Sequence, residues 1–313
     1  MKGLELARAY YEAHGKEMLE TQFSEVFPYL AVGLAGSGSE CYGYDDLTSR
    51  DHDFEPGFCI FLPDEDVVDR RTAFLLERAY AKLPKEFMGI RRSNLSPVGG
   101  NRHGVIRMAD FFLEKTGTAD GLLSAEGWFS VPEYGLLEAT NGAVFSDPYG
   151  LFTQIRKRLC RYPEDIRRKK LAGHLLLMGQ AGQYNYPRCL ARQERAAAQL
   201  AVFEFTKSAL QSIYLINQTY MPYYKWSFRG MKELDRLGAL SADLEYLISS
   251  GNTEKEAEEK TQRIENICAA ICQELRAEGL VTMEKNEMEP MAYALNDTVC
   301  DHNLRNLHIL YGV

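Results

Sequence analysis

The pattern of apolar and polar residues changes near residue 150. Before it, apolar runs bounded by glycine, proline or aspartate predict buried strands at 30–35, 54–62 and 104–108. Apolar residues at helical spacing predict helices at 3–27, 66–83 and 109–115. Beyond it the spacing is helical throughout, with helices predicted at 151–159, 163–179, 187–218, 228–237, 242–250, 254–278 and 290–307. We therefore expect an α+β chain, with a mixed sheet flanked by helices in a domain at 1–150 and an all-helical domain at 151–313.

A glycine-punctuated polar turn follows the first predicted strand. Gly36 and Gly38 would let the backbone approach a polyanion closely, and Ser37 and Ser39 would add hydroxyl donors. A short helix after the turn would add free N–H groups at its N-terminus. These features favour a phosphate group as the ligand, although turns rich in Gly, Ser and Asp also occur simply as structural caps.

Two carboxylates follow the turn, at Asp51 and Asp53. In an extended segment, residues i and i+2 project from the same face, so these side chains would lie side by side. Because two close carboxylates repel each other, the arrangement indicates a bound cation, and ligands that are all oxygen favour Mg²⁺. Turn and carboxylates together predict a site for a nucleoside triphosphate and its metal.

This run resembles the signature of the nucleotidyltransferase superfamily typified by DNA polymerase beta and kanamycin nucleotidyltransferase. The signature is an apolar strand, Gly-Ser, a spacer of about ten residues and an Asp-x-Asp/Glu strand, here with His52 between the two aspartates. The resemblance implies a nucleotidyltransferase-like N-terminal fold, with Asp51 and Asp53 as catalytic metal ligands and Gly36, Ser37 and Ser39 on the phosphates. ATP is the expected triphosphate, and the acceptor would be a hydroxyl of a small molecule or a protein.

Two more residues enter through the same resemblance. The superfamily often has a third carboxylate on a neighbouring strand, and Asp110, just after the predicted strand 104–108, is the candidate. Asp110 is equally well placed as an acidic residue in the first turn of the next helix. Lys225 corresponds to a lysine of the helical domain that reaches the triphosphate, or else it extends from an aromatic cluster into solvent.

A second resemblance covers more of the chain. Segments from Trp128 to Leu137, 142–147, 162–165 and Asn217 to Trp226 resemble an uncharacterised bacterial family of unknown function with a nucleotidyltransferase-like N-terminal half. It implies an architecture and a reaction type without a substrate. Two alternatives to an active transferase stay open. One is a nucleotide-binding regulatory module without turnover, and the other is an antitoxin-like transferase fused to a ribonuclease-like helical domain, which rests on Arg168 and His174.

Composition limits the remaining classes. A net charge of −8, from 36 basic and 44 acidic residues, argues against a general nucleic-acid-binding protein. The seven cysteines are scattered without a zinc-like spacing, and no apolar run approaches the length of a membrane span. We therefore expect a cytoplasmic protein without a membrane partner.

Overall fold

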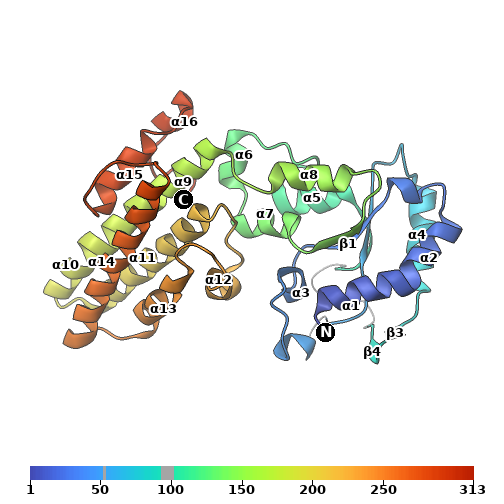
Figure 1. The fold of residues 1–313 in the computed structure, drawn as a ribbon, viewed down its shortest axis with the longest axis horizontal. Coiled ribbons are helices and arrows are strands. Elements are labelled where there is room, and N and C mark those ends of the chain that lie inside the picture. Colours follow the sequence, from blue (N-terminus) through green and yellow to red (C-terminus); the bar gives the residue numbers. More distant parts are fainter. Residues whose placement is uncertain (52–53, 93–101) are drawn as a thin grey trace. The chain divides into compact units, whose positions relative to one another are not determined.

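The structure, a computed structural model, describes residues 1–51, 54–92 and 102–313 (Figure 1). The chain divides into two compact units by its internal contacts. Unit 1 comprises residues 1–123 and 134–160, and unit 2 comprises residues 124–133 and 161–313. The domain boundary at residue 150 stays a prediction, and each unit is described below by itself.

Unit 1 is built on a mixed sheet that, within the described residues, has the strand order β5-β2-β1-β6. Its strands are β1 (Ala31–Leu34), β2 (Cys59–Leu62), β5 (Gly104–Arg107) and β6 (Ala143–Ser146). β1 runs antiparallel to both β2 and β6, and β2 runs parallel to β5. A separate two-stranded ribbon consists of β3 (Glu86–Phe87) and β4 (Ile90–Arg91). The predicted α+β class with a mixed sheet is confirmed.

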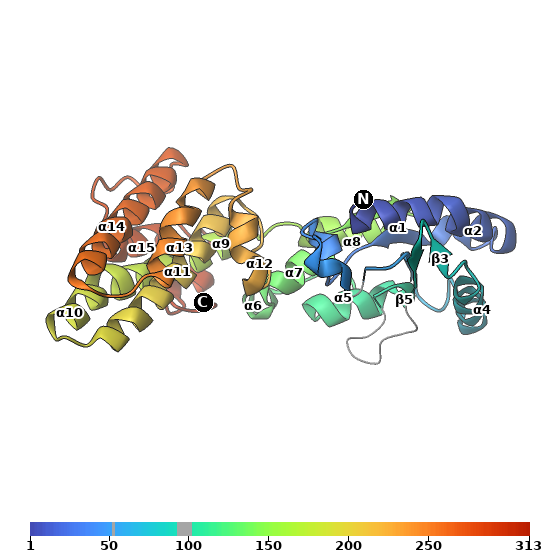
Figure 2. The same ribbon diagram turned by 90° about the horizontal axis from the view of Figure 1, so that it is seen from below.

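Helices cover both faces of this sheet because alternate residues of β2 are apolar on both sides. Ile60 packs with Tyr10 and Leu76 in the core on one face, whereas Phe61 stacks on Phe152 at 4.1 Å on the other. Figure 2 shows α1 and α5 on opposite sides of the strands. The helical segments of unit 1 are α1 (Gly3–Tyr10), π-helical η1 (Tyr11–Gly15), α2 (Lys16–Gln22), η2 (Phe27–Tyr29), α3 (Ser39–Tyr42), η3 (Thr48–Asp51), α4 (Arg70–Ala81), α5 (Met108–Thr116), α7 (Glu133–Thr140) and α8 (Leu151–Leu159).

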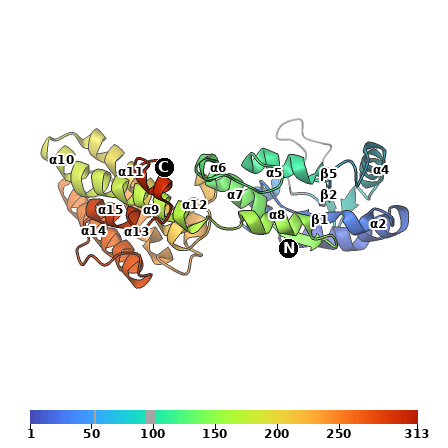
Figure 3. The same ribbon diagram turned by 90° about the horizontal axis from the view of Figure 1, so that it is seen from above.

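Unit 2 is helical throughout its described residues. Its segments are α6 (Ala125–Ser130), α9 (Glu164–Met178), π-helical η4 (Gly179–Asn185), α10 (Tyr186–Ala191), α11 (Arg195–Ile216), α12 (Tyr224–Met231), η5 (Gly238–Leu240), α13 (Ser241–Ser249), α14 (Glu254–Ala277), α15 (Met288–Asn296) and α16 (His302–Asn306). α9 packs against both α11 and α15 (Figure 3). The helix predicted at 254–278 is confirmed as α14, and its residues Ile264, Ile267 and Ile271 are all buried in the common core.

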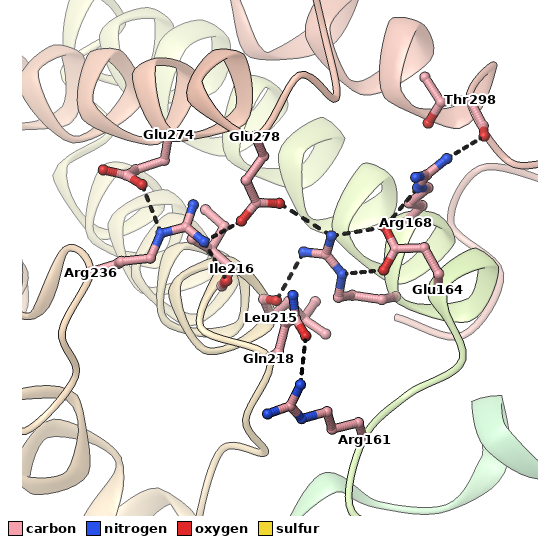
Figure 4. Close-up of polar contacts among 11 residues, drawn as sticks. Arg161, Glu164, Arg168, Leu215, Ile216, Gln218, Arg236, Glu274, Glu278 and Thr298 are labelled. Atoms are coloured by element: carbon pink, nitrogen blue, oxygen red, sulfur yellow. Dashed lines mark hydrogen bonds and ion pairs between the residues drawn. The ribbon is translucent and has the colours of Figure 1, made fainter.

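An ion-pair network ties together the ends of three helices in unit 2 (Figure 4). Arg167 of α9 pairs with Glu164 at 2.9 Å and Glu278 at 3.2 Å. Arg236 pairs with Glu278 and, at 2.8 Å, with Glu274. Both guanidiniums also donate to carbonyl oxygens at the C-terminal end of α11, where a helix leaves acceptors unpaired.

Some elements differ from those that the sequence predicts. The helix predicted at 187–218 is two helices, because the chain turns at Gln193, which has a φ of 62°. The strand predicted at 54–62 begins only at Cys59, and α6, α7 and β6 were not predicted as elements.

Candidate functional site

The predicted phosphate-binding turn directly follows β1, the strand between β2 and β6. Its glycines have φ angles of 114° at Gly36 and 126° at Gly38, which side chains rarely adopt. At Gly38 a Cβ atom would also lie 2.5 Å from the carboxylate of Glu40. The backbone angles therefore favour glycine at both positions, and a side chain at Gly38 would also force the carboxylate of Glu40 to move.

Asn141 fixes this turn from a distant part of the sequence. Its side-chain oxygen accepts the N–H of Gly36 at 2.9 Å, and its side-chain nitrogen donates to the carbonyl of Gly36 at 2.9 Å. The guanidinium of Arg156 in turn donates to the carbonyl oxygens of Thr140 and Asn141. Because the N–H of Gly36 is already bonded, Gly36 shapes the turn and is no ready donor to a ligand.

The two serines of the turn keep their hydroxyls available. Ser37 and Ser39 are half-buried, and within the part of the chain that the structure describes neither hydroxyl has a hydrogen-bond partner. Half-buried hydroxyls on a fixed turn are suited to donate to an oxyanion, because little conformational freedom is lost on binding.

The side chain of a lysine lies near the same turn. Cε of Lys115 is 4.0 Å from the position that a Cβ atom on Gly36 would occupy. The ammonium of Lys115 pairs with Glu138 at 2.9 Å and with Glu114 at 3.0 Å. The hydroxyl of Tyr42 donates to the other oxygen of Glu138 at 3.1 Å. None of these residues carries a local sequence signal, since they come from α3, α5 and α7.

The pKa directions of Lys115 and Tyr42 fit a charged lysine beside a tyrosine that keeps its proton. Burial alone would lower the pKa of Lys115, but the hydrogen bonds that its ammonium donates to Glu138 and Glu114 outweigh burial and raise the pKa. Burial, together with Glu138, raises the pKa of Tyr42 well above its usual value. Tyr42 therefore remains a donor at neutral pH.

The predicted carboxylates are placed only in part. The backbone of Asp51 ends η3, eight residues before β2 begins, so the described part of the segment is a helical turn where an extended strand was expected. The side chain of Asp51 and the whole of Asp53 lie outside what the structure describes. Asp110 is exposed in the first turn of α5, directly after β5, the neighbour of β2. Among residues 1–51, 54–92 and 102–313, no group of three His, Cys, Asp or Glu side chains has a metal-binding arrangement.

The residues predicted in the helical half lie in unit 2. Lys225 is exposed at the start of α12, with its ammonium 5.2 Å from the centre of the Trp226 ring. Arg168 pairs with Glu164 and donates to the carbonyl of Thr298. His174 is only 6% exposed, and burial, reinforced by two nearby lysines, lowers its pKa from 6.5 to about 3. A buried, neutral imidazole gives the ribonuclease hypothesis no support.

Among the residues that the structure describes, no helix is long and apolar enough to cross a membrane.

Comparison with known proteins gives one partial match. Residues 128–227 match a family described as a domain of unknown function, DUF4037. Neither the curated proteins nor the solved structures include a significant match to the chain. The matched segment contains Glu138, Asn141 and Arg156, which support the turn, whereas the turn itself lies outside the segment. The family description carries no activity.

Proposed function

We propose that the chain is a Mg²⁺-dependent nucleotidyltransferase with a nucleotidyltransferase-like N-terminal fold. It would transfer a nucleoside monophosphate from a triphosphate, with ATP expected, to a hydroxyl of a small molecule or a protein. The observation that carries the proposal is the turn after β1, where the hydroxyls of Ser37 and Ser39 have no hydrogen-bond partner among the described residues and the side chain of Lys115 lies near Gly36. Such a turn is suited to the oxygens of a polyphosphate.

The residues of the chain would act mainly by binding and orienting the reactants. In the transfer, the acceptor oxygen bonds to the α-phosphorus as the bond to the β-phosphate oxygen breaks, and pyrophosphate leaves. Ser37 and Ser39 would hold the leaving phosphates in line with the acceptor. Asp51 and Asp53 would hold Mg²⁺, since carboxylate oxygens suit this ion, with Asp110 as a third carboxylate. When bound, Mg²⁺ neutralises the charge on the phosphates.

Binding of a non-hydrolysable ATP analogue with Mg²⁺ tests the proposal without knowledge of the acceptor. Titration calorimetry on the full chain should show saturable binding that Ser37→Ala weakens. Asp51→Asn/Asp53→Asn should abolish the dependence of binding on Mg²⁺. The control Asp64→Asn/Asp66→Asn, at exposed positions of unit 1, should leave binding unchanged. Absence of binding to any triphosphate analogue would end the proposal.

Turnover is tested separately, by pyrophosphate release with each of the four triphosphates and a panel of hydroxyl compounds. Mass spectrometry of the chain itself and of cell-extract proteins extends the search to protein acceptors. We expect Asp51→Asn/Asp53→Asn to reduce the rate by about 100-fold or more, because the metal supplies several kcal/mol of transition-state stabilisation.

A regulatory nucleotide-binding module is the second candidate, favoured by one observation. β5 contains no acidic residue, and Asp110, the nearest candidate, is exposed on a helix. Binding of the analogue without pyrophosphate release from any triphosphate would favour this module over the transferase.

A further inference from the structure

The two carboxylate partners of Lys115 differ in their exposure to water, which a lysine that only links α5 to α7 does not require. Lys115 and Glu138 are each only 12% exposed at the side chain, whereas the second partner, Glu114, is 72% exposed. One carboxylate is therefore fixed and the other is largely in water. An exposed ion pair contributes little free energy because water screens it, so Glu114 is readily displaced.

The fixed part of the cluster orients the ammonium. Glu138 accepts from Tyr42 through one oxygen and from Lys115 through the other, so its carboxylate cannot rotate without losing a bond. Together these contacts fix the side chain of Lys115 near Gly36, with Cε 4.0 Å from the position of a Cβ atom there. An ammonium has three N–H donors, and its contacts with Glu138 and Glu114 leave one without a partner among the described residues.

We propose that Lys115 binds the polyphosphate of the nucleotide at the Ser37–Ser39 turn, and that Glu114 holds the position of a phosphate oxygen until the ligand displaces it. This inference rests on the proposed function and names the cation of the same site. Glu138 and Tyr42 are positioning residues, which act through Lys115. In this proposal the ligand contacts the hydroxyls of Ser37 and Ser39 and the ammonium of Lys115. All three residues belong to unit 1, and Lys225 is not required.

The proposal makes predictions of opposite sign for two neighbouring residues. Lys115→Met should weaken binding of inorganic tripolyphosphate at least about tenfold, because a charge-assisted hydrogen bond is lost. Glu114→Gln should strengthen binding about two- to fivefold, because a competing anion is removed. Lys115→Arg should recover part of the affinity, since it retains the charge. A lysine that only ties α5 to α7 would predict no gain for Glu114→Gln.

The full-length chain is titrated with tripolyphosphate by calorimetry, with circular dichroism as a check that each variant is folded. The exposed i,i+4 pair Lys16 and Glu20 in α2 gives the matched control, and neither Lys16→Met nor Glu20→Gln should change the affinity. Binding that is insensitive to both Lys115→Met and Glu114→Gln, yet weakened by Ser37→Ala, would overturn this inference and leave the proposed function standing.

The titration with tripolyphosphate has two further outcomes that decide between the proposals. Lysine-dependent binding of tripolyphosphate without pyrophosphate release from any triphosphate would support the inference and contradict the transferase. A wild-type chain that binds the ATP analogue but not tripolyphosphate would overturn the inference alone, and a chain that binds neither would overturn both.

Discussion

Asn141 shows how one side chain can support a backbone turn from about a hundred residues away. Its amide pairs with both polar groups of Gly36, as a neighbouring peptide would in a strand. Asn141→Ala removes both bonds and leaves two half-buried backbone groups unpaired. We expect a loss of about 2–3 kcal/mol in the free energy of unfolding, measured with urea and circular dichroism.

The control for this change is Gln22→Ala, at an exposed position of the same unit. A loss below about 0.5 kcal/mol in Asn141→Ala would mean that the turn keeps its shape without the amide.

His174 links stability to pH. In the unfolded chain its pKa is 6.5, and in the folded chain it is about 3. Between these values the unfolded state binds a proton that the folded state does not, so stability falls as the pH falls through this window. We expect His174→Leu to reduce the slope of unfolding free energy against pH by up to about 1.4 kcal/mol per unit between pH 6 and 4.

Gln22→Ala, at an exposed position, provides the comparison, because it removes no ionisable group and should leave the slope unchanged. An unchanged slope in His174→Leu would show that the folded imidazole titrates normally.

At the scale of elements, the pairing of β1 with β6 depends on Gly33. A Cβ atom there would lie 2.5 Å from the carbonyl oxygen of Ala143, and the strand pairing is irregular at this point. Since backbone atoms cannot give way cheaply, Gly33→Ala should lower the free energy of unfolding by about 2 kcal/mol or more. Urea titration against Gly43→Ala gives the comparison.

Gly43 has a φ of 74° with no atom within 4 Å of its Cβ position, so alanine there meets only backbone strain, of about 1 kcal/mol. Equal losses in the two variants would show that β6 moves away freely.

The elements that the sequence predicts well are those with a clear period or a clear stop. The helices predicted at 151–159 and 254–278 agree with the observed α8 and α14 to within one residue at each end. β6 was missed because its residues are all half-buried and show no alternation. The break at Gln193 was missed because neither glycine nor proline marks it.

The residues of the candidate site also divide into those that a local sequence signal marks and those that it does not. The turn at Gly36–Ser39 is a local motif and could be predicted, whereas Lys115, Glu138 and Asn141 could not. They reach the turn only through the packing of α5 and α7 on the sheet, and no spacing in the sequence records that packing.

At the scale of the whole molecule, α6 lies in unit 2 although it interrupts the sequence of unit 1. Phe129 of α6 packs against Gly312 and, at 5.2 Å between ring centres, against Tyr311. Phe129→Ala should therefore destabilise unit 2, by about 3 kcal/mol. Tryptophan fluorescence reports this unit specifically, because both tryptophans of the chain, Trp128 and Trp226, belong to it.

The matched control is Leu122→Ala. Leu122 belongs to unit 1, lies two residues before Ser124, the N-cap residue of α6, and is 65% exposed. A fluorescence midpoint that shifts equally in both variants, or in neither, would contradict the assignment of α6 to unit 2.

The division of the chain has a practical consequence for anyone who chooses a recombinant fragment from the family match. A fragment cut at 128 and 227 would carry β6 without β1, its partner strand, and α9 without α15. It would expose two incomplete cores and aggregate, so the recombinant fragment is a poor starting point for assays. A recombinant fragment should contain both the turn at Gly36 and the last helices, α15 and α16.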